Sequence, residues 1–324
     1  MAAPPAVALG NVTGVRRAVV FLVAGLLTGT AFAQSTQEPP EAKVVRPKDL
    51  VAVQGPAPVG RFFVKAGADS LNSDLYQMTF SPPGFDRLTT DARVTTVGAC
   101  PDKVVVAAAQ REVGYADRLQ ELAGDKLVPV ETLGLEAGSD PDLAEDCRIL
   151  YSRLAPGAGS ELAQEIRLWD PAKGAASTVT SGATVRGAGW GPGGEIAVLK
   201  REPAGPRLQI IKPDGTSTEI DPQVADVGNT PWGKSGWMAL AVFSQPGQPP
   251  TGTLFLNPAT GERSPLDGWL PLAWSPDGTQ LLVAEAKDGT TLAVVELADL
   301  TRTRNVGVST VGTVWDAVWL PAGG

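Results

Sequence analysis

Apolar residues in this chain gather in short runs, each bounded by a turn sequence. The clearest example is LAWSPDGTQLLVA, residues 272–284, in which a tryptophan precedes a Pro-Asp-Gly turn and an uncharged run from Leu281 to Ala284. Short apolar runs between Gly, Pro and Asp residues are typical of β-strands joined by tight turns. The pattern therefore predicts a chain of short antiparallel strands.

The same order of residues recurs with a nearly constant period. Trp190, Trp232, Trp274 and Trp319 each lie beside an apolar strand, at intervals of 42, 42 and 45 residues. Two weaker copies, TVGACPDKVVVAAA and DLAEDCRILYSR, bring the number of such openings to six. A period of about 40–45 residues is that of a four-stranded propeller blade.

A second element, two β-rich runs around a turn, lies between the openings. Its six copies, which we predict to be the outer hairpins of the blades, are residues 75–90, 118–132, 165–179, 207–220, 253–266 and 291–306. We also expect one helical turn, in the sequence LAQE at residues 162–165.

The two series are offset at the chain ends. The strand at 61–66 precedes the first hairpin without a tryptophan-type opening, and the strand at 314–320 has no hairpin after it. Pairing these two strands would complete a blade and protect the sheet edges. We therefore predict an all-β fold, a six-bladed β-propeller with four-stranded antiparallel blades over residues 56–324.

The N-terminal segment has the features of an export signal. Residues 1–33 contain Arg16 and Arg17, no acidic residue, and sixteen apolar or small residues from Ala18 to Ala33. This run is short for a membrane span and suits a signal peptide cleaved between Ala33 and Gln34. The alternative is an uncleaved anchor. In either case we expect the protein to be secreted or extracytoplasmic, with residues 34–55 as a disordered Pro-rich tether.

The composition of the chain disfavours several kinds of catalytic site, metal site and partner. The chain has no histidine, which removes the commonest general base and imidazole metal ligand. Removal of residues 1–33 would change the formal net charge from −8 to −10, which disfavours nucleic acid as a partner. We expect no catalytic residue, cofactor or metal, and a monomer.

The two cysteines, Cys100 and Cys147, fall at similar points of adjacent repeats. In an exported protein this spacing favours a disulfide, and two separate buried thiols are the alternative.

The sequence WSPDG at 274–278, with the following strand and LAVVEL, resembles the WD40-like repeat of TolB-type propellers. The hairpins at 75–90 and 207–221 are similar to the outer strands of that family. The resemblance implies an exported, non-enzymatic, six-bladed propeller that makes protein contacts at the cell envelope. The chain departs from TolB in having no room for the α/β domain that precedes its propeller, so the resemblance concerns shape rather than membership of the Tol-Pal system.

Two sets of residues have competing interpretations. The repeated tryptophans, Trp190, Trp232, Trp274 and Trp319, fit a core role between blades better than a stacking platform for a ligand. Asp102, Asp214 and Asp277 each follow a proline, where a carboxylate accepts turn hydrogen bonds more often than it binds a metal.

Four residues are candidates for binding at the mouth of the channel because they lie near the starts of inner strands: Arg186, Asn229, Trp315 and Asp316. Our main hypothesis is an interaction scaffold for an envelope protein or peptide. The alternative is a secreted hydrolase or lyase acting on carbohydrate or lactone. A third possibility is a sensor domain tethered through uncleaved residues 18–33.

Overall fold

The computed structural model describes residues 56–70, 72–80, 83–109, 117–124, 126–130, 138–155, 163–224, 226–227, 232–245 and 248–322. All of them belong to one compact unit, Ala42–Gly324. The expected signal, its cleavage point and the tether lie outside these ranges. The described residues form strands and turns without a helix, so none of them forms a helix suited to crossing a membrane.

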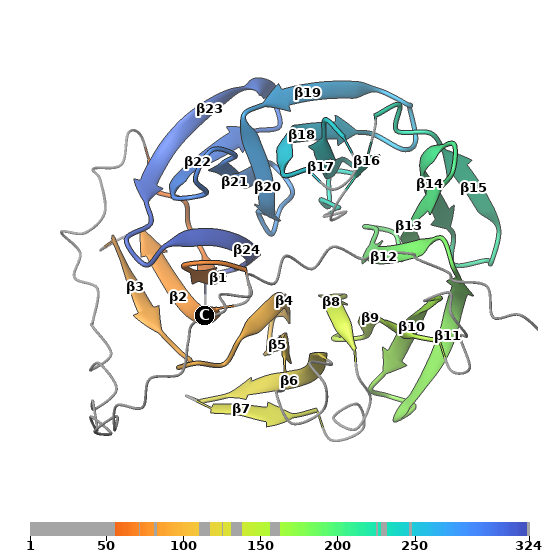
Figure 1. Ribbon diagram of the computed structural model, residues 1–324, viewed down its shortest axis with the longest axis horizontal. Coiled ribbons are helices and arrows are strands. Elements are labelled where there is room, and N and C mark those ends of the chain that lie inside the picture. Colours follow the sequence, from red (N-terminus) through yellow and green to blue (C-terminus); the bar gives the residue numbers. More distant parts are fainter. Residues whose placement is uncertain are drawn as a thin grey trace, which may run out of the picture. The chain divides into compact units, whose positions relative to one another are not determined.

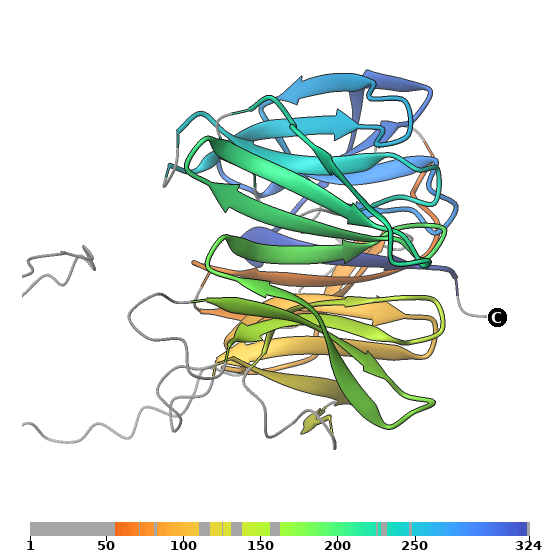
Figure 2. The same cartoon turned by 90° about the vertical axis from the view of Figure 1, so that its right-hand side faces the viewer.

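The strands form six antiparallel sheets of four strands, arranged around a common centre (Figure 1; the side view is Figure 2). We number these sheets as blades 1–6. From the centre outward, blade 1 contains β24 (Thr313–Leu320), β1 (Arg61–Gly67), β2 (Ser73–Phe80) and β3 (Pro83–Arg87). Blade 2 contains β4 (Val94–Cys100), β5 (Lys103–Ala109), β6 (Asp117–Ala123) and β7 (Lys126–Pro129). Blade 3 contains β8 (Ser139–Leu143), β9 (Ile149–Leu154), β10 (Gln164–Asp170) and β11 (Ala175–Gly182).

The other three blades follow the chain in the same order. Blade 4 contains β12 (Val185–Trp190), β13 (Ile196–Glu202), β14 (Gly205–Ile211) and β15 (Ser217–Ile220). Blade 5 contains β16 (Asp226–Val227), β17 (Met238–Phe243), β18 (Pro250–Leu256) and β19 (Arg263–Asp267). Blade 6 contains β20 (Trp269–Trp274), β21 (Gln280–Glu285), β22 (Thr291–Glu296) and β23 (Asp299–Val308).

Blade 1 closes the ring with strands from both ends of the propeller. β1 pairs with β24 in antiparallel register, from Arg61 opposite Leu320 to Ala66 opposite Val314. This pairing confirms the predicted closure and the count of six blades. Because β24 is the innermost strand of blade 1, this blade has its full four strands and the inner edge of β1 is paired.

The core consists of six apolar layers, one between each pair of neighbouring blades. Each layer takes side chains from both blades: Leu208 of blade 4 packs with Met238 of blade 5, and Phe255 of blade 5 packs with Trp274 of blade 6. Successive side chains of a strand point to opposite faces, so each blade contributes to the layers on both of its sides. We call these interblade layers 1/2 to 6/1, after the blades they join.

Tryptophans fill the inner ends of four layers. Trp190, Trp274 and Trp319 are buried, and Trp232 is half-buried. The ring of Trp274 lies over Gly233 of the preceding blade, where a Cβ atom would come within 2.8 Å of the ring, and Trp232 lies over Gly191 at the same distance. The Trp-Gly pairs in the sequence therefore serve packing, since each glycine makes room for the ring of the next blade.

The predicted helical turn at 162–165 is wrong at its described end. Gln164 and Glu165 belong to β10, where they pair with Leu154 and Arg153 of β9. Sheet pairing with a distant strand overrides the weak helical preference of this short sequence.

Candidate functional site

The inner strands share an irregularity that shapes the centre of the ring. In β4, β8, β12, β20 and β24 one extra residue interrupts the pairing with the next strand. The extra residue is Thr95 in β4, Arg186 in β12, Leu272 in β20 and Trp315 in β24, whereas in β8 the bulge spans Asp140 and Pro141. A bulge bends its strand and changes the direction of a side chain. Each of these strands therefore bends at the level of its bulge.

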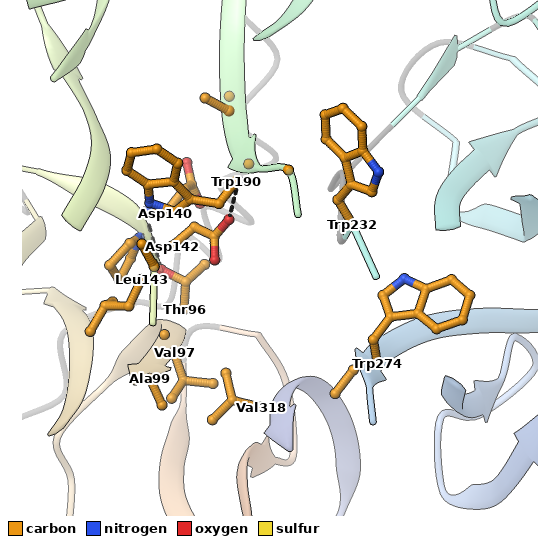
Figure 3. Close-up of a pocket in the computed structure, with 18 of the residues that line it drawn as sticks. Thr96, Val97, Ala99, Asp140, Asp142, Leu143, Trp190, Trp232, Trp274 and Val318 are labelled. Carbon is orange, nitrogen blue, oxygen red and sulfur yellow. Dashed lines mark hydrogen bonds between the residues drawn. The ribbon is translucent and has the colours of Figure 1, made fainter. Parts of the chain in front are cut away.

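The inner strands enclose a cavity of about 910 Å³. Its wall combines apolar side chains, carboxylates and a few cations. Figure 3 labels Thr96, Val97, Ala99, Asp140, Asp142, Leu143, Trp190, Trp232, Trp274 and Val318, and the wall also includes Arg186 and Asp316. This volume lies within the range of small-ligand and peptide sites. We refer to it as the central cavity.

Two carboxylates in the wall bind the backbone of the neighbouring blade. Asp316 of blade 1 accepts a hydrogen bond from the Val97 backbone N–H of blade 2 at 2.9 Å. Asp142 of blade 3 accepts one from the Trp190 N–H of blade 4 at 2.7 Å (Figure 3). Each carboxylate therefore joins two blades while one side of it faces the cavity.

Burial changes the ionisation of these carboxylates. It raises the pKa of Asp316 to about 7, against the hydrogen bond from Val97 and the charge of Lys65. It raises the pKa of Asp142 to about 6, against the backbone hydrogen bonds from Trp190 and Leu143. Both groups can exchange a proton near neutral pH, as groups in acid–base sites often do.

A buried lysine accompanies Asp316. Lys65 is 5% exposed and donates from Nζ to the Thr95 carbonyl at 2.6 Å. Burial lowers the pKa of Lys65, while the charges of Asp316, Asp117 and Asp140 raise it. Burial also raises the pKa of Asp140, whose carboxylate accepts hydrogen bonds from Ser139 and Ser152. A compact polar network thus lies where blades 1, 2 and 3 meet, and its members Asp140 and Asp316 line the cavity.

The turns at the other end of the cavity carry paired charges. Glu145, in the turn of blade 3, forms an ion pair with Lys234, in the turn of blade 5, and both residues line the cavity. Arg148 lies 4.7 Å above the centre of the Trp190 ring and forms an ion pair with Asp146 at 2.8 Å. These exposed pairs contribute little to stability and can exchange for charges on a ligand.

The structure separates the four residues predicted at the channel mouth. Arg186 and Asp316 line the central cavity, and Arg186 also donates to the carbonyls of Ala183 and Val185. Trp315 is 41% exposed and is not part of the cavity wall. Asn229 lies outside the described residues.

The other predicted residues have structural contacts. Cys100 and Cys147 are joined in a disulfide that links blades 2 and 3. Asp277 accepts hydrogen bonds from the Ser275 hydroxyl and from Thr279, and Asp214 accepts them from Thr216, all within their own turns, which lowers the pKa of both aspartates. These two aspartates act as turn residues away from the cavity wall.

Sequence reasoning missed Lys65, Asp140 and Asp142. Lys65 lies in an ordinary strand sequence, GRFFVKAG, and its burial depends on strands from two other parts of the chain. Asp140 has a left-handed backbone (φ 52°) in the β8 bulge, and no local sequence motif predicts this bulge. The one available signal was the pair of aspartates in SDPDL, directly before a predicted opening strand.

Within the described part of the chain, no three His, Cys, Asp or Glu side chains are placed to hold a metal ion. Asp142 and Asp316 instead use their oxygens on backbone N–H groups of different blades.

Comparison with known proteins gives matches at the level of structure. No protein-family model and no curated protein matches the sequence. TolB from Acinetobacter baumannii is similar with a TM-score of 0.64 and 17% identity, over 81% of this chain and 67% of that one. Hydrazine synthase from Kuenenia stuttgartiensis also has a TM-score of 0.64, with 10% identity over 83% of this chain and 47% of its own.

A gluconolactonase from Xanthomonas campestris is similar with a TM-score of 0.51 and 10% identity, over 73% of this chain and 86% of that one. Similarity at these identities establishes the fold and leaves function to the site. The chain therefore has the six-bladed propeller fold seen in TolB, as its repeats predict.

Proposed function

We propose that the protein is an exported, non-enzymatic interaction scaffold that binds a segment of a partner protein or peptide in its central cavity at the cell envelope. The observation that carries this proposal is the wall of the cavity. It combines apolar and polar side chains, and the carboxylates of Asp142 and Asp316 are engaged with backbone N–H groups of different blades instead of converging on one point. Mixed walls of this kind suit a peptide, which has both apolar side chains and backbone polar groups.

The charged turns at the end of the central cavity, which we call its rim, support the same function. The pair Glu145–Lys234 reaches from blade 3 to blade 5, past the turn of blade 4, which consists of Gly191, Pro192, Gly193 and Gly194. A partner segment that entered the cavity would meet one charge of each sign at this rim. Both charges are exposed, so exchanging the internal pair for contacts with the partner costs little.

A glycine in the wall offers a direct test. A Cβ atom at Gly187 of β12 would have no neighbour within 4 Å, so Gly187→Trp should fill the cavity without disturbing the blade. Gly84→Trp on the outer strand β3 is a matched control, because its Cβ would contact only Thr79 at 3.6 Å.

In the experiment, a photo-crosslinking residue replaces Val318 in the cavity wall, and crosslinked peptides from the native envelope are identified by mass spectrometry. We expect a defined partner peptide that is lost with Gly187→Trp and kept with Gly84→Trp. No adduct, or equal adducts in both variants, would contradict the scaffold function.

A second candidate is a hydrolase or lyase acting on carbohydrate or lactone. The observation that favours it is the pair of cavity carboxylates with raised pKa, about 6 for Asp142 and about 7 for Asp316, which suits general acid–base catalysis. Lactone hydrolysis that falls by about 100-fold or more in Asp316→Asn would support this candidate over the scaffold.

A further inference from the structure

A second cavity, of about 670 Å³, lies at the opposite ends of blades 1 and 2 from the Pro101 turn. It shares no lining residue with the central cavity. Its wall comes from the end of β1, the start of β2, the end of β3, the loop that leads into β4, the end of β5 and the turn before β24. It comprises Ala66, Gly67, Ala68, Asn72, Ser73, Asp74, Tyr76, Arg87, Asp91, Arg93, Ala109 and Val311. The proposed function does not use this cavity.

Asp74 organises the cavity wall. Its Oδ2 accepts a hydrogen bond from Arg87 at 2.5 Å, and its Oδ1 accepts hydrogen bonds from the Thr89 hydroxyl at 2.9 Å and the Ala92 N–H at 3.0 Å. These bonds fix the loop in which Asp91 and Arg93 both adopt left-handed backbone conformations, with φ of 53° and 52°. Asp74 is 7% exposed, and these contacts engage both of its oxygens, so its charge is matched inside the protein.

The charged groups of the second cavity that can still bind a ligand are mainly positive. Among the described residues, the guanidinium of Arg93 has no hydrogen bond or ion pair, although its side chain is half-buried in the cavity wall. Arg87 binds Asp74 and the Thr89 carbonyl and keeps further N–H donors. Half-buried guanidinium groups are usually paired, so a free one in a cavity points to an absent partner.

The hydroxyl of Tyr76 is an uncharged hydrogen-bond donor in the wall of the second cavity. Tyr76 is 9% exposed and lines the cavity, and its hydroxyl has no hydrogen-bond partner in the described part of the chain. Tyr76 lies directly opposite Arg87 in the pairing of β2 with β3, and both side chains line the cavity. Asn72 and Ser73, in contrast, already donate to Asp69.

We propose that this second cavity binds a small oxyanion, a carboxylate or phosphate group, through Arg93, the free donors of Arg87 and the Tyr76 hydroxyl. Guanidinium groups recognise both oxyanions through paired N–H donors. Asp91, an exposed carboxylate near Arg87, opposes the charge of the ligand and limits affinity.

The charged residues allow substitutions with opposite effects. Arg93→Gln removes the free cation, and Tyr76→Phe removes only the hydroxyl while the ring keeps its edge contact with Phe85. Asp91→Asn removes the opposing charge, and asparagine tolerates a left-handed backbone. Arg263→Gln, on the exposed edge of blade 5, is the control for the same charge change elsewhere.

The measurement is isothermal titration of the purified full chain at low ionic strength, with inorganic phosphate in one arm and citrate in the other. The arm that saturates identifies the oxyanion. We expect Arg93→Gln to weaken binding by about tenfold and Tyr76→Phe by about threefold. We expect Asp91→Asn to strengthen it by about threefold and Arg263→Gln to leave it unchanged.

Three results would overturn the proposal: neither probe saturates; Arg93→Gln binds as tightly as Arg263→Gln; or Asp91→Asn weakens binding, which would contradict the role of Asp91 as a charge that opposes the ligand. Thermal melting of each variant shows whether a loss of binding reflects a loss of fold, and Tyr76→Phe gives an independent reading if Arg93→Gln is unstable.

Discussion

The interblade layers of this propeller fall into two groups. Layers 3/4, 4/5, 5/6 and 6/1 have a tryptophan at their inner ends, from Trp190, Trp232, Trp274 and Trp319. In layers 1/2 and 2/3 the corresponding residues are Ala99 and Leu143. The inner ends of these two layers therefore lack a tryptophan, although Tyr151 and Trp169 pack on the outer strands in layer 2/3 and Phe63 packs in layer 1/2.

The two joints without a ring have other links between the blades. In layer 2/3, Cys147 occupies the left-handed turn position that Gly278 occupies in blade 6, with φ of 60° and 72°, and its disulfide to Cys100 joins the turns. In layer 1/2, Arg61 of blade 1 donates to the Pro101 carbonyl of blade 2 at 2.9 Å. At the two inner ends that lack a tryptophan, a covalent bond or a polar contact joins the blades.

The largest expected effect is the loss of a ring. Trp274→Ala leaves an empty space above Gly233 and beside Phe255, and should lower the free energy of unfolding by about 3–5 kcal/mol in urea denaturation. Trp315→Ala is the control, since this tryptophan is 41% exposed and should change stability by less than about 1 kcal/mol. Equal effects of the two substitutions would refute the packing role of the repeated tryptophans.

The disulfide should rank next. The double variant Cys100→Ser with Cys147→Gly copies Ser275 and Gly278 of blade 6, and should lose about 2–4 kcal/mol because its unfolded state is less constrained. A reducing agent should destabilise the wild type by a similar amount and leave the variant unchanged. If the variant is as stable as the wild type, layer 2/3 does not depend on the bond.

Carboxylates that cross layers 1/2 and 3/4 should make stability depend on pH. Because the folded-state pKa of Asp316 and Asp142 is raised, the folded protein keeps protons that the unfolded chain releases, and stability falls as pH rises. We expect a loss of about 2 kcal/mol between about pH 4 and about pH 7, reduced from the full linkage value because both groups face the cavity.

Denaturation across this pH range checks the sign, and Asp316→Asn should flatten the profile more than Asp142→Asn. Carboxylates with lowered pKa, such as Asp277, lose their stabilising contribution only below about pH 4 and do not mask the effect. A stability that rises from pH 4 to pH 7 would contradict the assignment.

The smallest effect is expected at Arg61. Arg61→Ala removes its hydrogen bonds to the Pro101 and Pro321 carbonyls and should cost about 0.5–1 kcal/mol, measured by the shift in thermal melting temperature. Arg61→Lys keeps the charge but cannot reach both carbonyls with the same geometry, and should recover only part of the loss. A loss as large as that of Trp274→Ala would mean that layer 1/2 depends on this contact far more than its exposure suggests.

The fold was predictable because the residues that recur in each repeat are the ones that pack between the blades. The spacing of Trp190, Trp232 and Trp274 reports the blade length directly, and the unmatched strands at both ends predict the closure. The central cavity was predictable only in part. Arg186 and Asp316 could be placed near the starts of inner strands by counting, whereas the bulges and the burial of Lys65 depend on how distant strands pair.

The central claim about the two groups of layers can be tested by hydrogen exchange, measured by mass spectrometry before and after reduction of the disulfide. We predict that reduction increases exchange first in β4 and β8, on either side of layer 2/3, while β12 and β20 keep their protection. An equal increase in all four strands, or no change in β4 and β8, would contradict the account.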